Sequence, residues 1–365
     1  MRLPLRIALS CCVLAIGCAG QLTHKPSARV HVYDDPRLSV ISPTVRDEIS
    51  VGDARVAADY AVDAVSAATA ALTVDAVSSA THFTERRHQA GVSAALALAS
   101  QSELSAGYGL SLEPDHRVHA PSIGLTHELS HSMVRASLHY QLVAEAIGRT
   151  GAASLDAHAL GHRVDLGWTQ ILTPTLSLTG LLTGTAYRCS GDLGCFANPY
   201  RYVGVAAGGG ETLALSERHP SERFTFASAL RAAWALSSRS ALHAGYRLSQ
   251  DSWRVTAHTG DVSLAVEILL NVLLVRLEGR ATAQSAASFY RQRYRTDDRA
   301  APAYRTADAE LSALWNVRLQ LHLEWTLGPI RIVGQLGRLW SQYPNFRSLP
   351  ERHALLAGLG IDGEL

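Results

Sequence analysis

The stretch PSIGLTHELSHSMVRASLHYQ, residues 121–141, separates two possible folds for this chain. It contains the spacing H-E-x-x-H, which on a helix would place His127 and His131 on one face as zinc ligands, with Glu128 as a general base. On both sides of the motif, however, apolar residues alternate with small or polar residues. A period of two predicts two strands that meet at a turn within SHS. On a strand, His127 and Glu128 point to opposite faces, and the ligand-and-base geometry is lost.

The zinc alternative stays open at the level of sequence. A helical stripe is approximated by Leu125, Leu129, Met133, Ala136 and Tyr140. His139 or Glu145 would then offer a third ligand, although no H-x-x-G-x-x-H extension follows the motif. We therefore prefer the strands and keep a zinc metallopeptidase that uses His127, Glu128 and His131 as an alternative.

The same alternation recurs along the chain. It is clearest in RVAADYAVDAV (55–65), ELSAGYGLSLE (103–113) and LQLHLEW (319–325), each with an apolar and a polar face. No segment after the N-terminus has about 20 consecutive apolar residues, as a transmembrane helix needs. Repeated segments of about ten residues with one apolar and one polar face are typical of a transmembrane β-barrel with a wet interior. We predict an all-β, antiparallel transmembrane β-barrel of about 14–16 strands.

The expected connections alternate between short and long. Short turns are expected near residues 100, 130, 173, 238, 268 and 317, and longer links at 66–85, 143–155, 187–222 and 285–304. This asymmetry predicts short turns on one side of the barrel and long loops on the other. Trp168, Trp234 and Trp315 each lie beside an expected short turn, as an interfacial aromatic girdle requires.

A soluble β-sandwich also alternates, and a secreted ligand-binding sandwich is a second alternative. Sandwich strands are usually shorter than the segments found here. The length of the segments therefore favours the membrane barrel.

Composition excludes some partners. The 365 residues carry a formal net charge of +1, with 47% hydrophobic and 18% charged residues. Nucleic-acid binding needs clustered Lys and Arg, and the arginines of this chain are scattered, so we expect no nucleic-acid partner. No sequence pattern calls for a cofactor.

The N-terminus has the architecture of a secretory signal. Arg2 and Arg6 precede an apolar run over residues 7–16, and small residues follow. Either the sequence AIGC is a lipobox that lipidates Cys18, or cleavage follows Gly20. We expect residues 1–20 to be a signal peptide, 21–36 a periplasmic segment, and 37–365 the barrel, with a long loop at 187–222.

Two cysteines remain after the signal, Cys189 and Cys195 in RCSGDLGCF. An isolated pair in an exported chain predicts a small-loop disulfide, since it lacks companion ligands for zinc.

Charged residues on the polar faces are candidates to line the lumen. In a barrel they pair across strands and brace the wall, or line a water-filled path. Because both signs are present, strong ion selectivity is not expected. The lumen-facing candidates are Arg55, Asp59, Asp63, Glu103, Glu113, Arg135, Arg163, Asp165, Arg247, Arg276, Glu278, Arg280, Asp308, Glu310 and Glu324.

Several stretches, in order, carry a family resemblance. They are YDDPRLSVISPTV (33–45), VDAVSAAT (62–69) with TERR (84–87), FANPYRYV (196–203) with ERHPSER (217–223), GYRLSQDSW (245–253) and QSAASFYRQRY (284–294). With them the chain resembles the bacterial family known as domain of unknown function 3570, in particular its myxobacterial-type members. The resemblance implies a signal-bearing barrel in the outer membrane of a Gram-negative bacterium, with no established catalytic residue.

The resemblance and the patterns together give a functional expectation. We expect a non-enzymatic barrel without cofactors that contacts outer-membrane lipid and the barrel-assembly machinery, and that serves as a narrow passive channel or as a scaffold for periplasmic partners. The long loop, bordered by Tyr200, Arg201, Arg218, Pro220 and Arg223, is expected to fold over or into the mouth, where its arginines pair with inward carboxylates.

Overall fold

The computed structural model describes residues 22–69, 81–99, 101–129, 133–148, 157–191, 197, 202–206, 212–295, 303–346 and 350–365. In these residues sixteen strands form a closed antiparallel barrel and three short strands form a separate sheet. The one described helix is the single turn η2 (Ala309–Leu311). The all-β barrel of about 14–16 strands predicted from the alternation is therefore confirmed, and the soluble β-sandwich is wrong.

The barrel strands follow one another around the wall with their chain order preserved. They are β1 (Leu22–Asp35), β2 (Leu38–Val51), β3 (Ala54–Thr69), β4 (Thr81–Ala99), β5 (Ser102–Leu112), β6 (His116–Leu129), β7 (Val134–Ile147), β8 (Ala157–Thr173), β9 (Leu176–Ser190), β12 (Glu222–Ser237), β13 (Ser240–Asp251), β14 (Thr256–Leu269), β15 (Leu273–Gln284), β17 (Leu314–Leu327), β18 (Ile330–Gln342) and β19 (Glu351–Gly363). The separate sheet has the order β11 (Thr212–Ser216), β10 (Tyr202–Ala206), β16 (Tyr294–Arg295).

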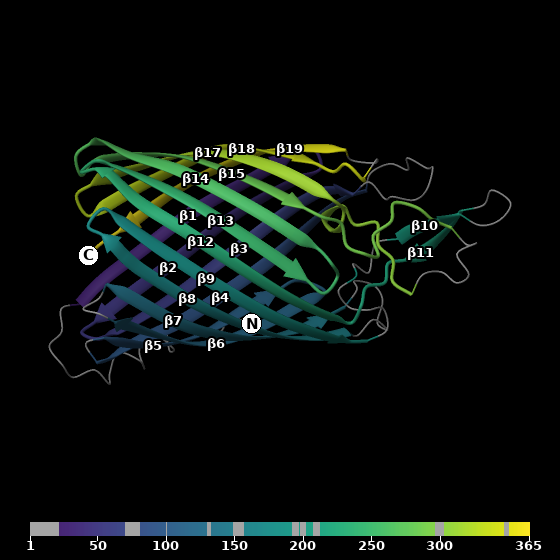
Figure 1. Ribbon diagram of the computed structural model, residues 1–365, viewed down its shortest axis with the longest axis horizontal. Helices are drawn as coiled ribbons and strands as arrows, with labels where there is room; N and C mark the ends of the chain where they lie inside the picture. The colour runs from purple at the N-terminus through teal and green to yellow at the C-terminus, as the bar shows by residue number, and fades with distance from the viewer. Residues whose placement is uncertain are drawn as a thin grey trace, which may run out of the picture.

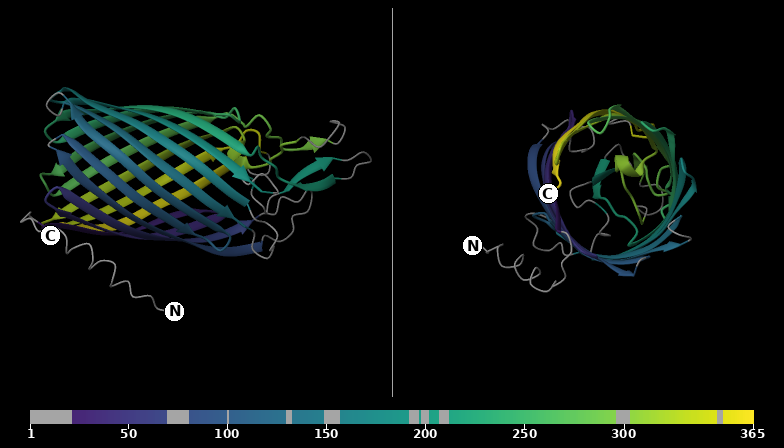
Figure 2. Two further views of the ribbon diagram at one scale, coloured as in Figure 1. Left: turned by 90° about the horizontal axis from the view of Figure 1, so that it is seen from below. Right: turned by 90° about the vertical axis from the view of Figure 1, so that its left-hand side faces the viewer.

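The two ends of the barrel differ, as predicted. At one end, neighbouring strands are joined by two to four residues. At the other end the links reach 31 residues between β9 and β12 and 29 residues between β15 and β17. The small sheet of β10 and β11 lies beyond this second end (Figure 1), and Figure 2 shows the tilted strands from below and the view along the barrel axis.

The N-terminal boundary of the barrel is earlier than predicted. Residues 21–36 were expected to be a periplasmic segment, but Leu22–Asp35 form β1, which pairs with β2 and with β19. The first strand was missed because Pro26 and His24 interrupt an apolar face. With β1 included, the number of strands is even. The first residue of β1 and the C-terminus therefore both lie at the short-turn end (Figure 2).

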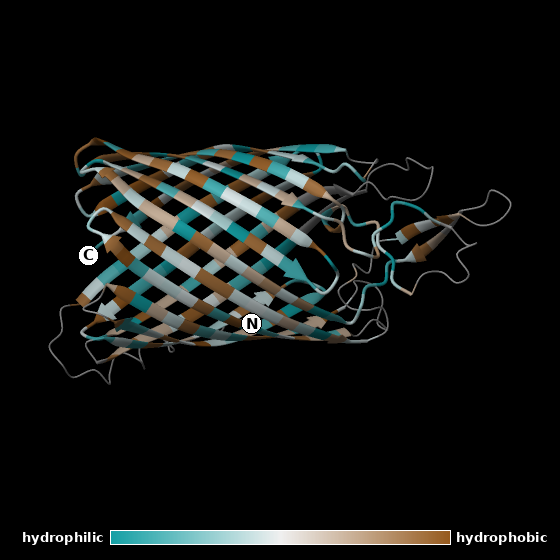
Figure 3. Ribbon diagram, in the orientation of Figure 1, coloured by the Kyte–Doolittle hydropathy of each residue, from teal (hydrophilic) through white to brown (hydrophobic). Residues whose placement is uncertain are grey.

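The wall has an apolar convex face and a polar concave face. Along β6 the exposed residues alternate with less exposed ones, because a closed barrel spreads side chains on its outside and crowds them on its inside. Leu264, Leu277, Leu321 and Leu336 lie opposite one another in register across β14, β15, β17 and β18, and all four are exposed. The alternation of hydropathy along the strands is visible in Figure 3.

No helix among the described residues is long and apolar enough to cross a membrane.

One expected turn is wrong. Residues 314–327 form the continuous strand β17, so there is no turn near 317. Trp315 accordingly lies at the long-loop end of its strand, near Trp340 of β18. Trp168 and Trp234 do lie near the short turns at 174–175 and 238–239.

A charge on the convex face should destabilise the barrel. Leu277→Arg places a guanidinium at an outward position that is 58% exposed. We expect a loss of roughly 2–4 kcal/mol in the free energy of unfolding in lipid vesicles, because a charge near the bilayer midplane costs that much. Urea unfolding followed by tryptophan fluorescence measures this change. The control is Ser263→Arg, on the concave face of the adjacent strand. An equal loss in both variants would contradict the assignment of the two faces.

Candidate functional site

Charged side chains on the concave wall pair across strands and along single strands. Arg55 of β3 binds Glu103 of β5 at 3.2 Å, and their side chains are 48% and 42% exposed. Arg163 binds Asp165, its neighbour on the same face of β8, at 2.7 Å. The Arg55–Glu103 pair is in contact with water on both sides, so it contributes little to stability, whereas Asp165 is only 15% exposed.

Most of the predicted lumen-facing residues lie on barrel strands, on the face opposite to the exposed apolar residues. These are Arg55, Asp59 and Asp63 of β3, Glu103 of β5, Arg135 of β7, Arg163 and Asp165 of β8, Arg247 of β13, Arg276, Glu278 and Arg280 of β15, and Glu324 of β17. Glu113 directly follows β5 and lies 3.6 Å from Arg87.

Two predicted residues are not on the wall. Asp308 and Glu310 lie in the link between β15 and β17. Asp308 caps the N-terminus of η2, and its carboxylate accepts a hydrogen bond from the Glu310 backbone N–H at 3.0 Å. A short polar capping residue before a helical turn can imitate strand alternation, which explains the error.

Sequence reasoning missed several charged residues of the wall. Arg87 binds Asp63 at 2.8 Å, and Asp261 lies 3.8 Å from both Arg231 and Arg280. Arg318 binds Glu278. Arg318 was hidden by the turn wrongly expected near 317, although the alternation that reaches Glu324 includes it.

Two carboxylates lie flat against the wall above glycines. A Cβ atom on Gly91 would be 2.7 Å from the Asp59 carboxylate, and one on Gly245 would be 2.9 Å from the Asp261 carboxylate. At these distances a side chain would displace the carboxylate, so each glycine leaves the space in which its neighbour's carboxylate lies. These carboxylates therefore extend less far into the lumen.

Small side chains form much of the concave wall between β3 and β7. Small and polar side chains such as Ser93, Gly107, Gly109 and Ser122 border a hollow of about 380 Å³. A wall of small side chains leaves space in the lumen rather than filling it.

The H-E-x-x-H motif lies on β6 in its described part. The His127 Nδ1 atom is 2.9 Å from the Ser102 hydroxyl, whereas Glu128 binds Arg135 on the other face. His131 lies outside the described residues. The strands predicted for both flanks are confirmed, and no group of three or more His, Cys, Asp or Glu side chains suited to a metal occurs in the described part of the chain.

Cys189, at the end of β9, is disulfide-bonded. Its predicted partner Cys195, like Cys18, lies outside the described residues.

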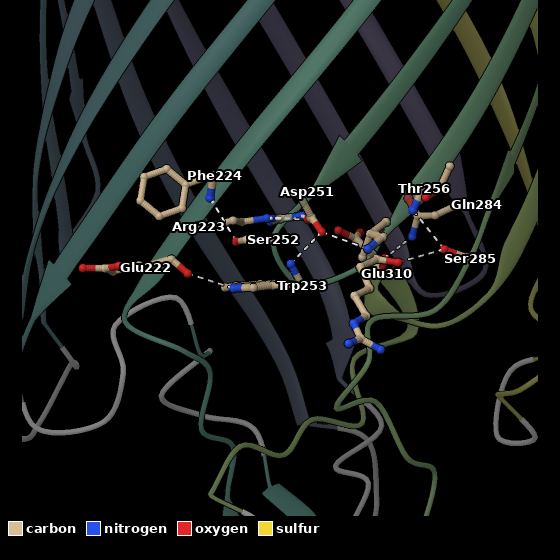
Figure 4. A network of polar contacts seen from close by, with 12 residues as sticks. Glu222, Arg223, Phe224, Asp251, Ser252, Trp253, Thr256, Gln284, Ser285 and Glu310 are labelled. Atoms are coloured by element: carbon tan, nitrogen blue, oxygen red, sulfur yellow. Dashed lines mark hydrogen bonds and ion pairs between the residues drawn. The ribbon is translucent and has the colours of Figure 1, made fainter.

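The long-loop end carries a network centred on Asp251, whose side chain is 3% exposed (Figure 4). One carboxylate oxygen accepts from the Arg223 Nε–H at 2.9 Å and from its terminal N–H at 2.7 Å. The other accepts from the backbone N–H groups of Trp253 and Val255, both at 2.9 Å. The guanidinium of Arg223 also lies 4.3 Å from the centre of a Trp253 ring. The expected pairing of a mouth arginine with an inward carboxylate is therefore present at Arg223.

Several loops pack together next to this network. Their buried side chains form a cluster of Trp253, Val255, Ala287, Tyr290, Leu311, Tyr343 and Phe346. The Tyr290 hydroxyl donates to the backbone carbonyl of Asn345 at 2.9 Å. We name the links 191–221, 252–255, 285–313 and 343–350, in their described parts, the cap. An apolar core gives the cap a defined structure at the mouth.

The small sheet is joined to the same links. Val203, Val205, Tyr294 and Ala307 form a second buried cluster. Glu217 is fully buried, and one of its carboxylate oxygens accepts from the Thr306 hydroxyl and from the Ala307 backbone N–H, both at 2.9 Å. Arg218 pairs through its backbone with Arg305. Tyr200 and Arg201 lie outside the described residues.

A closed, tilted antiparallel barrel with an apolar convex face and a charged concave face defines an outer-membrane β-barrel protein. The family described as "Protein of unknown function (DUF3570)" matches residues 158–330, which supports the resemblance carried by the quoted stretches. No curated protein matches the chain.

Solved structures with similar folds are distant in sequence. A bacterial polysaccharide outer membrane secretin has 8% identity and a TM-score of 0.53, over 95% of this chain and 99% of that one. The toluene transporter TodX from Pseudomonas putida has 11% identity and a TM-score of 0.44, over 95% and 90%. The siderophore receptor PirA from Pseudomonas aeruginosa has 11% identity and a TM-score of 0.46, over 89% of this chain and 56% of its own length. The likeness to the secretin shows a shared barrel fold.

Removing the charge at the centre of the network should loosen the cap. In Asp251→Asn, Arg223 loses a carboxylate partner whose side chain is only 3% exposed, and we expect local opening to become easier by roughly 1–3 kcal/mol. Limited proteolysis in detergent, followed by fragment masses, should show faster cleavage within the cap and an intact barrel. The control is Asp261→Asn, a more exposed wall carboxylate. Equal cleavage rates in the two variants would exclude Asp251 as the anchor.

The cap should also weaken at high pH. Burial raises the pKa of Tyr290 to about 12. The unfolded cap would lose this proton near pH 10 while the folded cap retains it, so the stabilisation is complete below about pH 10 and is lost as pH rises towards about 12. We expect cap cleavage by an alkali-tolerant protease to accelerate over this interval. Tyr290→Phe should weaken this pH dependence, and an unchanged profile in that variant would refute the role of Tyr290.

Proposed function

We propose that this protein is a non-enzymatic, passive channel for small hydrophilic solutes, with an external mouth narrowed by the cap. The observation that carries the proposal is the exposure of the charged side chains on the concave wall, such as the Arg55–Glu103 pair. A lumen packed with side chains would bury these groups. Their contact with water instead supports a hydrated path.

The chemistry of the wall supports low selectivity. Acidic and basic side chains are paired, and the carboxylates of Asp59 and Asp261 lie against the wall. Paired charges of opposite sign largely cancel the field that would favour cations or anions. We therefore expect size, rather than charge, to limit passage.

The cap supports a restricted mouth. In the view along the barrel axis (Figure 2), described strands and loops of the cap overlap part of the opening. Figure 1 shows that they lie at the long-loop end. Their buried cores favour one arrangement over a set of open ones. Solutes would thus pass beside a folded element.

We further propose that the barrel lies in the outer membrane. An apolar convex face and short turns at one end support insertion into the outer membrane of a Gram-negative bacterium, with the barrel-assembly machinery and lipid as partners. We also propose that residues 1–20 are an export signal, for which Arg2, Arg6 and the apolar run are the support. The order of the quoted stretches supports the myxobacterial type. Recovery of the full-length protein with an intact N-terminus in a detergent-free soluble fraction would refute this setting.

Conductance across planar bilayers tests the channel. We expect purified protein to give discrete steps with weak preference between K⁺ and Cl⁻. Replacing residues 203–217 with a short Gly-Ser linker should raise the step size roughly twofold, because part of the cap is removed from the path. The Ser263→Arg variant, which leaves the cap intact, controls for disturbance of the barrel.

Two outcomes would contradict the proposal. If neither form conducts while both are folded barrels by heat-modifiable migration, the channel is wrong, and a scaffold for periplasmic partners becomes the better account. If both conduct with equal steps, the cap does not narrow the path.

A further inference from the structure

Four tyrosine–histidine pairs with one common geometry lie on the described convex face. In each pair the tyrosine hydroxyl is within hydrogen-bond distance of the histidine Nδ1 atom, and the ring centroids are 6.2 Å apart. The pairs and their O–N distances are Tyr60–His88 (2.8 Å), Tyr108–His119 (2.6 Å), Tyr140–His162 (2.8 Å) and Tyr246–His258 (2.6 Å).

All four pairs lie at the same height. Every tyrosine is the seventh residue of its strand, counted from the short-turn end. Every histidine lies diagonally across on the next strand, two residues nearer the long loops. With about 3.3 Å per residue and a tilt of about 40°, the histidines lie about 23 Å above the short turns, near the upper edge of an apolar band about 25 Å tall.

The tyrosine fixes which nitrogen of the histidine faces the surroundings. When the hydroxyl donates to Nδ1, a neutral imidazole carries its proton on Nε2. All four histidines are exposed, so an Nε2–H group in this tautomer is accessible from outside the barrel. At this height the acceptors available to it are the oxygens of lipid headgroups.

Arginines extend two of the pairs. Arg86 and Arg117 lie on the same convex face as His88 and His119, two residues nearer the loops, and both are exposed. In register, His88 lies opposite Leu112, which lies opposite Arg117, so these basic groups share one patch over β4–β6. Neither arginine makes an ion pair with another described residue.

We propose that this basic patch, Arg86, His88, Arg117 and His119, binds the phosphate groups of an anionic glycolipid in the outer leaflet. Guanidinium and imidazole N–H groups complement phosphate oxygens, and the apolar wall beneath them accommodates acyl chains. The donors lie on the lipid-facing surface above exposed Leu104 and Ile123, which favours a lipid over a soluble anion. The proposal concerns the outside of the barrel and is independent of conductance.

Native mass spectrometry of the detergent-solubilised full chain tests the site. The probes are bisphosphorylated lipid A, the same lipid A after removal of its phosphates, and inorganic phosphate. We expect the wild type to retain bisphosphorylated lipid A. The variant Arg86→Gln/His88→Gln/Arg117→Gln/His119→Gln should bind it about tenfold more weakly, because several charge-assisted hydrogen bonds are lost.

The matched control is His127→Gln/Arg239→Gln, which removes the same residue types at the short-turn end and should bind like the wild type. Tyr60→Phe/Tyr108→Phe keeps the basic groups and should weaken binding to a smaller extent. Heat-modifiable migration establishes that each variant is folded. Equal retention of dephosphorylated lipid A, unchanged binding by the four-residue variant, or inorganic phosphate competing at concentrations similar to the lipid would each overturn the site.

Discussion

Closure of the sheet between β1 and β19 is the constraint on which the structure depends. In hydrocarbon no water is available to pair a free backbone N–H or C=O group, and each unpaired group costs several kcal/mol. The seam is paired from Ser27 with Asp362 to Asp34 with Leu355, and reciprocal backbone bonds of 2.9 Å between His24 and Leu365 extend it to the last residue. Because the backbone is satisfied within the wall, side chains on the convex face need only be apolar.

Closure also explains what the sequence predicts well and what it does not. A wall between lipid and water imposes a period of two, so the concave positions of Arg55, Glu103 and Glu324 follow from local alternation alone. The strand β1 could not be predicted in this way. Its backbone pairs with β19, more than 300 residues away, and its convex face carries His24 and Pro26, which interrupt the apolar pattern. Arg318 follows from the same alternation, but the turn wrongly expected near 317 separated it from the rest of β17.

The packing of the cap could not be predicted from the sequence, for a different reason. Its core brings Trp253, Tyr290 and Phe346 together from three separate links, and no periodicity within any one link reports such a contact. The stretches GYRLSQDSW and QSAASFYRQRY, which carry part of the family resemblance, contain Asp251, Trp253 and Tyr290. The resemblance thus lies to a large extent in residues that build the mouth rather than the wall. A barrel of this type obtains its individual properties from its loops, because alternation alone specifies the wall.

The central claim is that successive residues of one strand face lipid and water in turn. Spin labels placed singly at positions 317–324 of β17, in reconstituted vesicles, measure it through collision with oxygen, which concentrates in lipid, and with a water-soluble nickel chelate. The account predicts two oscillations of period two in opposite phase, with oxygen contact highest at 317, 319, 321 and 323 and nickel contact highest at even positions. Oscillations in phase, or a period near 3.6, would contradict it.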